Sequence, residues 1–221
     1  MLKKNDRLIN KELKLSKLKS KIIKVNTKIK NNFFINIKNK YFQNETIREN
    51  LFFVYEISKK LNLNKKLFVD TIENFKGLKY RQQIIYNKSK LTIINDSKST
   101  SFSSSVGVLK INSNIYWLLG GIPKKGDKFT LPKKYLNKTK AFIYGKNYSF
   151  FNKQLKNKIR IENFKNLKIA LSRIFALTKH EKIIDKTILF SPCAASFDTF
   201  KNFEDRGSYF NKLVKDYFHA K

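Results

Sequence analysis

The sequence has few of the residues that form metal sites and covalent cross-links. Its 221 residues include one cysteine, Cys193, and two histidines, His180 and His219. A single cysteine excludes a disulfide scaffold and a cysteine-based zinc site, and the two histidines lack ligand spacing. We therefore predict no metal site, solvated histidines, and a protein of the reducing cytoplasm.

Long apolar runs are also missing. No stretch approaches the roughly 18 apolar residues of a membrane-spanning helix, and the N-terminus lacks the apolar core of a signal peptide. We therefore expect no membrane partner. The motif Gly-x-x-x-x-Gly-Lys-[Ser/Thr] is absent as well, so a P-loop for nucleotide phosphates is not predicted.

Acidic residues are scarce. The sequence has 16 Asp and Glu against 48 Lys and Arg, a formal net charge of +32. Such a charge is typical of proteins that bind nucleic acid or acidic membranes. The lysines are, however, scattered beside Asn, Ile, Phe and Tyr, which AT-rich codons encode, and aromatic-basic RNA motifs are lacking. We expect no nucleic-acid partner, and keep a noncatalytic basic nucleic-acid-binding module as the alternative.

What is present predicts a packed fold in two parts, because hydrophobic residues make up 41% of the chain. Residues 1–76 begin with apolar runs typical of strands, at 21–25 and 33–37, and continue with helical periodicity over 44–62 and 65–75. Strands without covering helices cannot close a core, so we expect this segment to be the tail of a domain whose earlier part is absent. Gly77 breaks the pattern, which places a domain boundary near Lys76.

Residues 77–221 alternate between strands and helices, the pattern of an α/β fold with a mostly parallel sheet and crossover helices. Trp117 is expected in its core. Predicted helices start at residue 102, centre on 150, span 165–177, and end at 218. Strands are predicted over residues 81–86, 91–95, 115–119, 141–144, 159–161 and 187–190, the first two joined across 87–90.

Ligands of such sheets bind at the carboxyl ends of the strands. The loop over residues 95–100 leaves one of these ends. Lys98, flanked by hydroxyls and followed by a helix N-terminus, predicts an anion cradle, and Asp96 could accept hydrogen bonds from ribose. The simpler alternative is a polar turn with a helix N-cap. Arg81, just upstream, is either a phosphate contact or an exposed arginine without a role.

Two more loops leave strand ends, over residues 120–127 and 191–207. In the first, Asp127 stands where a P-loop needs lysine, so Lys124 is its candidate functional residue, with a solvated surface lysine as the alternative. The second is rich in small residues that let a ligand approach the backbone. We expect its following helix to begin near Gly207 and its N–H groups to bind a carboxylate or phosphate. Cys193 is predicted to be a packed residue, because no histidine is at hand to activate it.

Four segments, in order, resemble motifs of the UDP-N-acetylmuramoyl-L-alanine:D-glutamate ligases of the Mur ligase family. Residues 75–81 resemble F-x-G-L-x-H-R, and residues 95–100 resemble N-D-S-K-A-T. Residues 120–127 resemble G-G-x-x-K, and residues 191–207 resemble S-P-A-x-A-S-x-D-x-F-x-x-F-x-x-R-G. The resemblance covers essentially the whole chain. It implies that residues 1–76 are the end of the central ATPase domain and residues 77–221 the Rossmann-like C-terminal domain.

The resemblance also implies an activity in peptidoglycan synthesis. ATP phosphorylates the alanyl carboxylate of the UDP-sugar substrate, and the amine of D-glutamate attacks the acyl phosphate. The residues implied to contact ATP are Asn50, Arg81 and Asp96. Those implied to hold the two carboxylates of D-glutamate are Lys98, Thr100, Lys124, Ser196 and, through its backbone, Phe203.

Some family features have no counterpart in this sequence: the P-loop, the UDP-binding domain, the carbamylated lysine and the carboxylates that bind Mg²⁺. We therefore expect the chain to be inactive alone and to need an N-terminal half, supplied as a separate chain, that carries the metal ligands. Tyr80 replaces the family's His, Ser101 its usual Asn, and Cys193-Ala194 inverts its Ala-Cys order. These changes bear on the adenine contacts.

Overall fold

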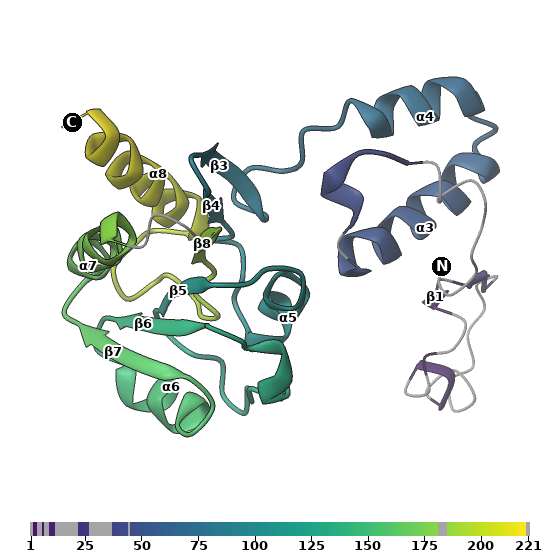
Figure 1. Ribbon diagram of the computed structural model, residues 1–221. Helices are drawn as coiled ribbons and strands as arrows, with labels where there is room; N and C mark the ends of the chain where they lie inside the picture. The colour runs from purple at the N-terminus through teal and green to yellow at the C-terminus, as the bar shows by residue number, and fades with distance from the viewer. Residues whose placement is uncertain are drawn as a thin grey trace. The chain divides into compact units, whose positions relative to one another are not determined.

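The chain divides into two compact units, Met1–Lys76 and Gly77–Lys221. In Figure 1 the first unit runs from purple to blue and the second from blue-green to yellow. The division falls where Gly77 interrupts the helical pattern of the sequence. The computed structural model describes residues 2–3, 6, 9–11, 22–26, 37–43, 45–180 and 185–219.

The two longest elements in the described part of the first unit are helices. Both predicted helices are confirmed, as α3 (Glu45–Lys60) and α4 (Lys65–Glu73). The side chain of Asn64 accepts a hydrogen bond from the Leu67 N–H at 3.1 Å, which caps α4. The buried hydrophobic cluster of this unit comprises Val25, Ile37, Leu51, Phe52 and Ile72.

The strands of the first unit are short. β1 (Leu2–Lys3) pairs in parallel with β2 (Lys24–Val25), and η1 (Lys40–Gln43) precedes α3. Within the described residues, the strand predicted over 21–25 is therefore only two residues long. The strand predicted over 33–37 lies outside the described residues apart from Ile37, which is buried but belongs to no strand.

A six-stranded sheet forms the centre of the second unit, in the order β3-β4-β8-β5-β6-β7. β3 is antiparallel to β4, and the other neighbours are parallel, so the predicted mostly parallel α/β sheet is confirmed. The strands are β3 (Gln83–Lys88), β4 (Leu91–Asn95), β5 (Ile115–Gly120), β6 (Lys140–Tyr144), β7 (Arg160–Phe164) and β8 (Lys186–Phe190).

Helices cover both faces of this sheet (Figure 1). α5 and α6 share one core cluster with Trp117 and Leu119 of β5, whereas α7 and α8 share the other with Tyr116 and Leu118. Because side chains alternate along a strand, burial on both faces explains the continuous apolar run of β5. The helices are α5 (Phe102–Ile111), α6 (Tyr148–Leu155), α7 (Leu167–His180) and α8 (Phe203–His219), with a short η2 (Lys133–Tyr135).

Several boundaries differ from those predicted. The β3–β4 turn consists of Ser89 and Lys90 alone, both at positive φ, 50° and 62°. The predicted connection across residues 87–90 is confirmed, but such turns usually contain Asn-Gly, so the sequence did not single out this pair. β7 continues to Phe164, and α7 spans Leu167–His180 rather than 165–177. None of the described helices is long and apolar enough to cross a membrane.

The predicted helix start near Gly207 is wrong. α8 begins at Phe203, because the Asn202 side chain accepts a hydrogen bond from the Asp205 N–H at 2.7 Å. Gly207 therefore lies in the second turn, where it is buried. Glu204 and Asp205 occupy the first turn, where their carboxylates interact favourably with the helix dipole.

Candidate ligand site at the carboxyl edge of the sheet

Three loops meet at one edge of the sheet. They follow β4, β8 and β5, which are neighbours and parallel, so these loops, which the sequence places at strand ends, lie at the same edge. Two of them also pair directly, because Ile122 and Ala195 exchange N–H···O hydrogen bonds of 2.9 Å in both directions. This bridge fixes Lys124, two residues after Ile122, in a loop joined to that of Ser196.

Arg206 of α8 ties the loops after β4 and β8 together. Its side chain is 1% exposed. Its Nε donates to Ser97 Oγ at 3.1 Å, its Nη2 to Ser97 O at 2.7 Å, and its Nη1 to Ala194 O at 3.0 Å. Ser97 Oγ in turn donates to Phe203 O at 2.8 Å. Burial lowers the pKa of the guanidinium, and Tyr144 and Asp198 oppose that shift.

Sequence reasoning assigned no role to Arg206, although the residue is part of the motif over 191–207. The sequence nevertheless indicates that this arginine is buried. Phe203, Arg206, Phe210 and Val214 recur at three- and four-residue steps, which puts the arginine on the apolar face of a helix. An arginine at such a position is buried only if its donors are satisfied, and here backbone carbonyls satisfy them.

Lys98 and Phe203 are brought into contact. The Lys98 ammonium lies 3.8 Å from the centroid of the Phe203 ring. The backbone N–H of Lys98 donates to Tyr80 O at 3.0 Å, which fixes the loop at this residue. No carboxylate of the described residues pairs with this half-buried lysine, so its ammonium has capacity for an anion.

The other residues implied to hold D-glutamate lie on the same three loops. Ser196 is 3% exposed, and no described group forms a hydrogen bond with its hydroxyl. Phe203 is the first residue of α8, so its N–H has no partner within the helix. Thr100 and Lys124 are exposed on the loops after β4 and β5. The edge therefore carries donors and cations from three loops.

Asp96 faces the protein interior. Its Oδ1 accepts from the Gln82 N–H at 3.1 Å and its Oδ2 from Ser191 Oγ at 2.8 Å. Burial raises the pKa of its carboxyl to about 7, although the two hydrogen bonds and the charge of Arg81 oppose the shift. Both oxygens already have a protein donor. Its contact with ribose therefore stays a prediction.

The two other residues implied to contact ATP are exposed. Arg81 lies between Tyr80 and β3 in the second unit, and its guanidinium is open to solvent. Asn50 lies on α3 and belongs to the first unit. Both side chains are accessible to a ligand.

Asp127 has a role that the sequence did not indicate. Its Oδ2 accepts a hydrogen bond from the Phe102 N–H, the first of α5, at 2.8 Å. A carboxylate of the protein therefore already occupies this helix N-terminus, where we expected part of an anion cradle. The cradle at residues 95–100 depends instead on the ammonium of Lys98.

Cys193 is a packed residue, as predicted. It is fully buried, its Sγ lies 2.8 Å from Ser105 Oγ, and burial raises the pKa of its thiol to about 12. A thiol of that pKa stays protonated at neutral pH and is not a nucleophile. His180 and His219 are solvated and Trp117 is buried, also as predicted. The described residues contain no group of three or more His, Cys, Asp or Glu that could hold a metal ion.

Three relatives that resemble the chain in sequence are ligases with the same name. The chain is 37% identical over 168 residues to the UDP-N-acetylmuramoylalanine--D-glutamate ligase of Rickettsia prowazekii, covering 76% of this chain and 38% of that protein. The ligase of the same name from Prochlorococcus marinus is 37% identical over 174 residues, covering 76% and 36%. That of Rickettsia bellii is 32% identical over 194 residues, covering 86% and 43%. The chain thus spans about two-fifths of the length of these relatives.

Solved structures share the fold. MurF from Acinetobacter baumannii matches with a TM-score of 0.56 at 16% identity, over 76% of this chain and 36% of that one. The UDP-N-acetylmuramate-alanine ligase MurC from Thermotoga maritima matches with a TM-score of 0.51 at 16% identity, over 78% and 38%. No protein-family model matches the chain. The sequence relatives, the ordered motifs and the shared fold agree: this chain belongs to the Mur ligase family, as a relative of the UDP-N-acetylmuramoylalanine--D-glutamate ligases.

Proposed function

We propose that this chain supplies the D-glutamate site of the ligase that joins D-glutamate to UDP-N-acetylmuramoyl-L-alanine in peptidoglycan synthesis. The observation that carries the proposal is the Arg206 clamp, which holds the loops after β4 and β8 together by hydrogen bonds to Ser97 and Ala194. It keeps the Lys98 ammonium beside the start of α8. A cation and several donors on adjoining loops suit a ligand with two carboxylates.

The role of these residues is positioning. The reaction that we propose transfers a phosphoryl group from ATP to the alanyl carboxylate, after which the amine of D-glutamate displaces phosphate and forms the amide. Lys98 and Lys124 would fix the carboxylates, and the hydroxyls of Thr100 and Ser196 and the N–H of Phe203 would orient them. Holding the amine toward the acyl carbon turns a bimolecular step into an effectively unimolecular one. We assign no acid or base in this chain.

For ATP, we propose contacts from Asn50, Arg81 and Asp96. The exposed guanidinium of Arg81 suits a phosphate. Mg²⁺ accompanies ATP in phosphoryl transfer. Because the described residues offer no metal-binding cluster, we assign none of them to Mg²⁺ and derive no step through it.

The activity requires the remaining part of a ligase, which we propose as the partner of this chain. The first unit supports this. α3 exposes Val54 and Ile57, the turn after it exposes Leu61, and α4 exposes Leu67, apolar side chains that the rest of a central domain would cover. We place the reaction in the cytoplasm, where a lone cysteine stays reduced. The comparisons lend no support to the alternative of a nucleic-acid-binding module.

D-Glutamate binding to the full chain, measured by isothermal titration calorimetry, tests the proposal. We expect saturable binding of D-glutamate, weaker binding of L-glutamate, and a loss of at least about tenfold in Lys98→Gln, because one charge-assisted contact is removed. Lys212→Gln, an exposed lysine of α8, is the matched control and should bind normally. No saturable binding to the folded chain, or an equal loss in the two variants, would contradict the proposal.

Activity gives a second test. The chain is mixed with a separately made polypeptide that carries the N-terminal part of the Rickettsia prowazekii ligase. We expect ADP release that depends on both halves and on D-glutamate. Absence of release while both halves are folded would argue against the shared activity.

A further inference from the structure

Tyr80 lies between two elements of the D-glutamate site, the loop after β4 and the helix α8, and belongs to neither. The residue is half-buried, and its φ is +62°, in the left-handed region that residues other than glycine rarely adopt. Such a backbone conformation persists only where the surrounding contacts fix it. The contacts of Tyr80 lead to Lys98 on one side and to α8 on the other.

The backbone of Tyr80 holds the loop after β4. Its carbonyl oxygen accepts a hydrogen bond from the Lys98 N–H at 3.0 Å. Two residues on, the Gln82 N–H donates to Asp96 Oδ1 at 3.1 Å, so the same two segments are joined twice. The N–H of Tyr80 donates to Gln83 Oε1 at 3.2 Å, which ties the residue to the start of β3. The place of Tyr80 therefore sets the place of the Lys98 backbone.

The ring of Tyr80 packs against Gly207 of α8. A Cβ added to Gly207 would overlap Cδ1 of the ring and would lie 2.7 Å from its Cγ. Only glycine leaves room for the ring at this point of the helix. Because glycine inside a helix is destabilising, its presence here is explained by this close approach.

The same turn of α8 is also tied to the end of β4. The Asn95 side chain is fully buried, and its Nδ2 donates to Gly207 O at 2.9 Å and to Asn211 Oδ1 at 2.7 Å. Its Oδ1 accepts from the Ser97 N–H at 3.0 Å. A buried amide and the ring of Tyr80 therefore both connect Gly207 to the segment that carries Lys98.

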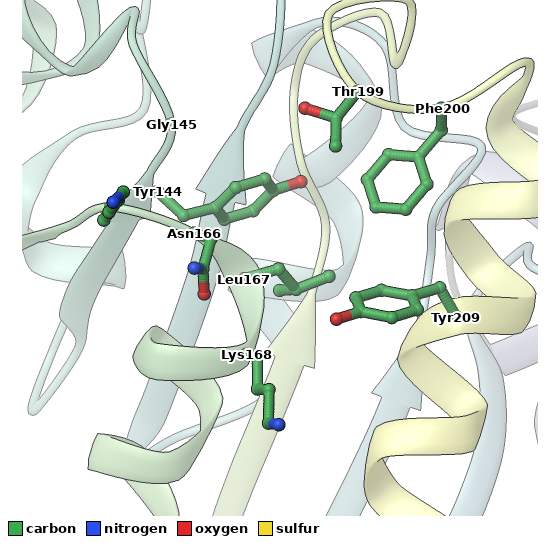
Figure 2. A pocket seen from close by; sticks show the side chains of 9 residues that line it. Tyr144, Gly145, Asn166, Leu167, Lys168, Thr199, Phe200 and Tyr209 are labelled. Carbon is green, nitrogen blue, oxygen red and sulfur yellow. The ribbon is translucent and has the colours of Figure 1, made fainter.

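The packing of α8 is looser where it faces α7. Tyr209 of α8 lines a hollow of about 310 Å³ together with Phe200 and Leu167 (Figure 2). A hollow supplies no atoms that could fix a helix, so the contacts at Gly207 have more weight in placing the start of α8. None of the residues assigned to D-glutamate lines this hollow.

Tyr80 thereby acts on both partners of one contact. Its carbonyl fixes the backbone of Lys98, and its ring seats α8 one turn after Phe203. The Lys98 ammonium lies 3.8 Å from the centroid of the Phe203 ring. Loss of the Tyr80 ring would let the helix and the loop move apart, and the ammonium would then no longer lie beside the first N–H of α8.

We propose that Tyr80 is a positioning residue of the D-glutamate site, whose carbonyl and ring together hold the Lys98 ammonium beside the start of α8. Its effect on D-glutamate rests on the function proposed above, whereas its effect on Lys98 does not. No described group forms a hydrogen bond with the Tyr80 hydroxyl. The ring is therefore the part of the side chain that matters.

Calorimetric titration of the full chain with D-glutamate tests the effect on the site. We expect Tyr80→Ala to bind D-glutamate at least about fivefold more weakly. Tyr80→Phe keeps the carbonyl and the ring, so it should bind as tightly as the unchanged chain. Tyr209→Ala is the matched control, since it removes a tyrosine ring that borders the hollow, and it should bind normally. Unchanged affinity in Tyr80→Ala, or an equal loss in Tyr209→Ala, would overturn the proposal.

Gly207→Ala approaches the same contact from the helix. Its Cβ would displace the ring, so this variant should also bind D-glutamate more weakly, although Tyr80 is intact. In the double variant Tyr80→Ala, Gly207→Ala the two losses should not add, because both changes break one contact. Additive losses would show that the two residues act separately and would refute the proposal.

The position of Lys98 can be measured without D-glutamate. In NMR spectra of the chain with ¹³C-labelled lysine, the Phe203 ring should shift the ε-methylene signal of Lys98 upfield, and Lys98→Gln identifies that signal. Tyr80→Ala and Gly207→Ala should move it toward the position of ordinary lysines, whereas Tyr80→Phe should not. A variant that is only less stable keeps the signal in place while it is folded.

An unmoved signal in both Tyr80→Ala and Gly207→Ala would refute the positioning role. This result is distinct from a failure of the proposed function, which would appear as no binding of D-glutamate to the unchanged chain. In that case the Lys98 signal alone decides whether Tyr80 positions the ammonium.

Discussion

At the residue scale, the candidate site depends on side chains that the protein buries rather than on those that it exposes. Arg206 and Asp96 are both charged types in the interior, and each organises backbone from a different loop. Burial of such groups is tolerated only when hydrogen bonds satisfy them. Each therefore makes the geometry of the edge sensitive to a single substitution.

Arg206→Met should destabilise the second unit by about 3 kcal/mol, because the carbonyls of Ser97 and Ala194 would lose their buried donors. Urea unfolding followed by the fluorescence of Trp117, the single tryptophan, measures the change. Arg173→Met is the matched control. This arginine bonds Glu162 from an exposed position, so its loss should cost under about 1 kcal/mol. Equal costs for both variants would refute the clamp.

Asp96 should make the stability of the chain depend on pH. Its pKa is about 7 in the folded chain and 3.8 ordinarily, so between these values the folded state binds more protons than the unfolded state. Stability must then fall as pH rises from 4 to 7, by up to about 4 kcal/mol from this group. Asp96→Asn should remove this contribution to the pH dependence of the free energy of unfolding, which urea unfolding at pH 5 and pH 8 measures. Identical pH dependence in the variant and the unchanged chain would contradict this.

At the element scale, the sequence allowed prediction of most of the second unit. Apolar runs such as β5 are recognisable because both faces of the sheet are covered. The connection across residues 87–90 was predicted, but its two-residue turn at Ser89 and Lys90 was not, since neither residue type favours positive φ. The start of α8 was misplaced because Gly207 suggested a close approach to a ligand. The approach is real, but it is to the ring of Tyr80, which an added Cβ would overlap.

The positions of the site's loops could be predicted from the sequence, but the contacts that these loops make could not. Lys98 and Ser196 were assigned to strand ends, and the parallel order β4-β8-β5 puts them on one edge. The roles of Asp127 and Arg206 arise from contacts 25 and 109 residues apart in sequence, with Phe102 and Ser97 respectively. No local pattern encodes such pairs.

In the loop after β5, the backbone is tightly constrained at Gly121. Its φ is +120°, and a Cβ there would overlap the carbonyl oxygen of Ala195. Gly121→Ala should therefore break the pairing of Ile122 with Ala195 and cost about 3 kcal/mol in urea unfolding. Gly126→Ala in the same loop is the control. It also has positive φ, +78°, but nothing lies within 4 Å, so only the backbone cost of about 1 kcal/mol is expected.

At the scale of the whole molecule, the chain has two separate cores. Among its described residues, the first unit has one cluster, formed by residues up to Ile72, and Val54, Ile57 and Leu67 of α3 and α4 remain exposed. The second unit has two clusters, one on each face of its sheet, and every member lies beyond Gly77. A unit with a complete two-sided core does not need the other for its own burial of apolar surface.

We therefore expect residues 77–221 to fold as an independent domain. Because both faces of its sheet are covered from within, removal of residues 1–76 should change its free energy of urea unfolding, followed by Trp117 fluorescence, by less than about 1 kcal/mol. Residues 1–76 alone should unfold without a sharp transition, since one small cluster stabilises few elements against the loss of chain entropy. If residues 77–221 lost their cooperative transition, the two units would have to share a core. Retention of the transition, with D-glutamate bound as tightly as by the full chain, would place that site within the second unit.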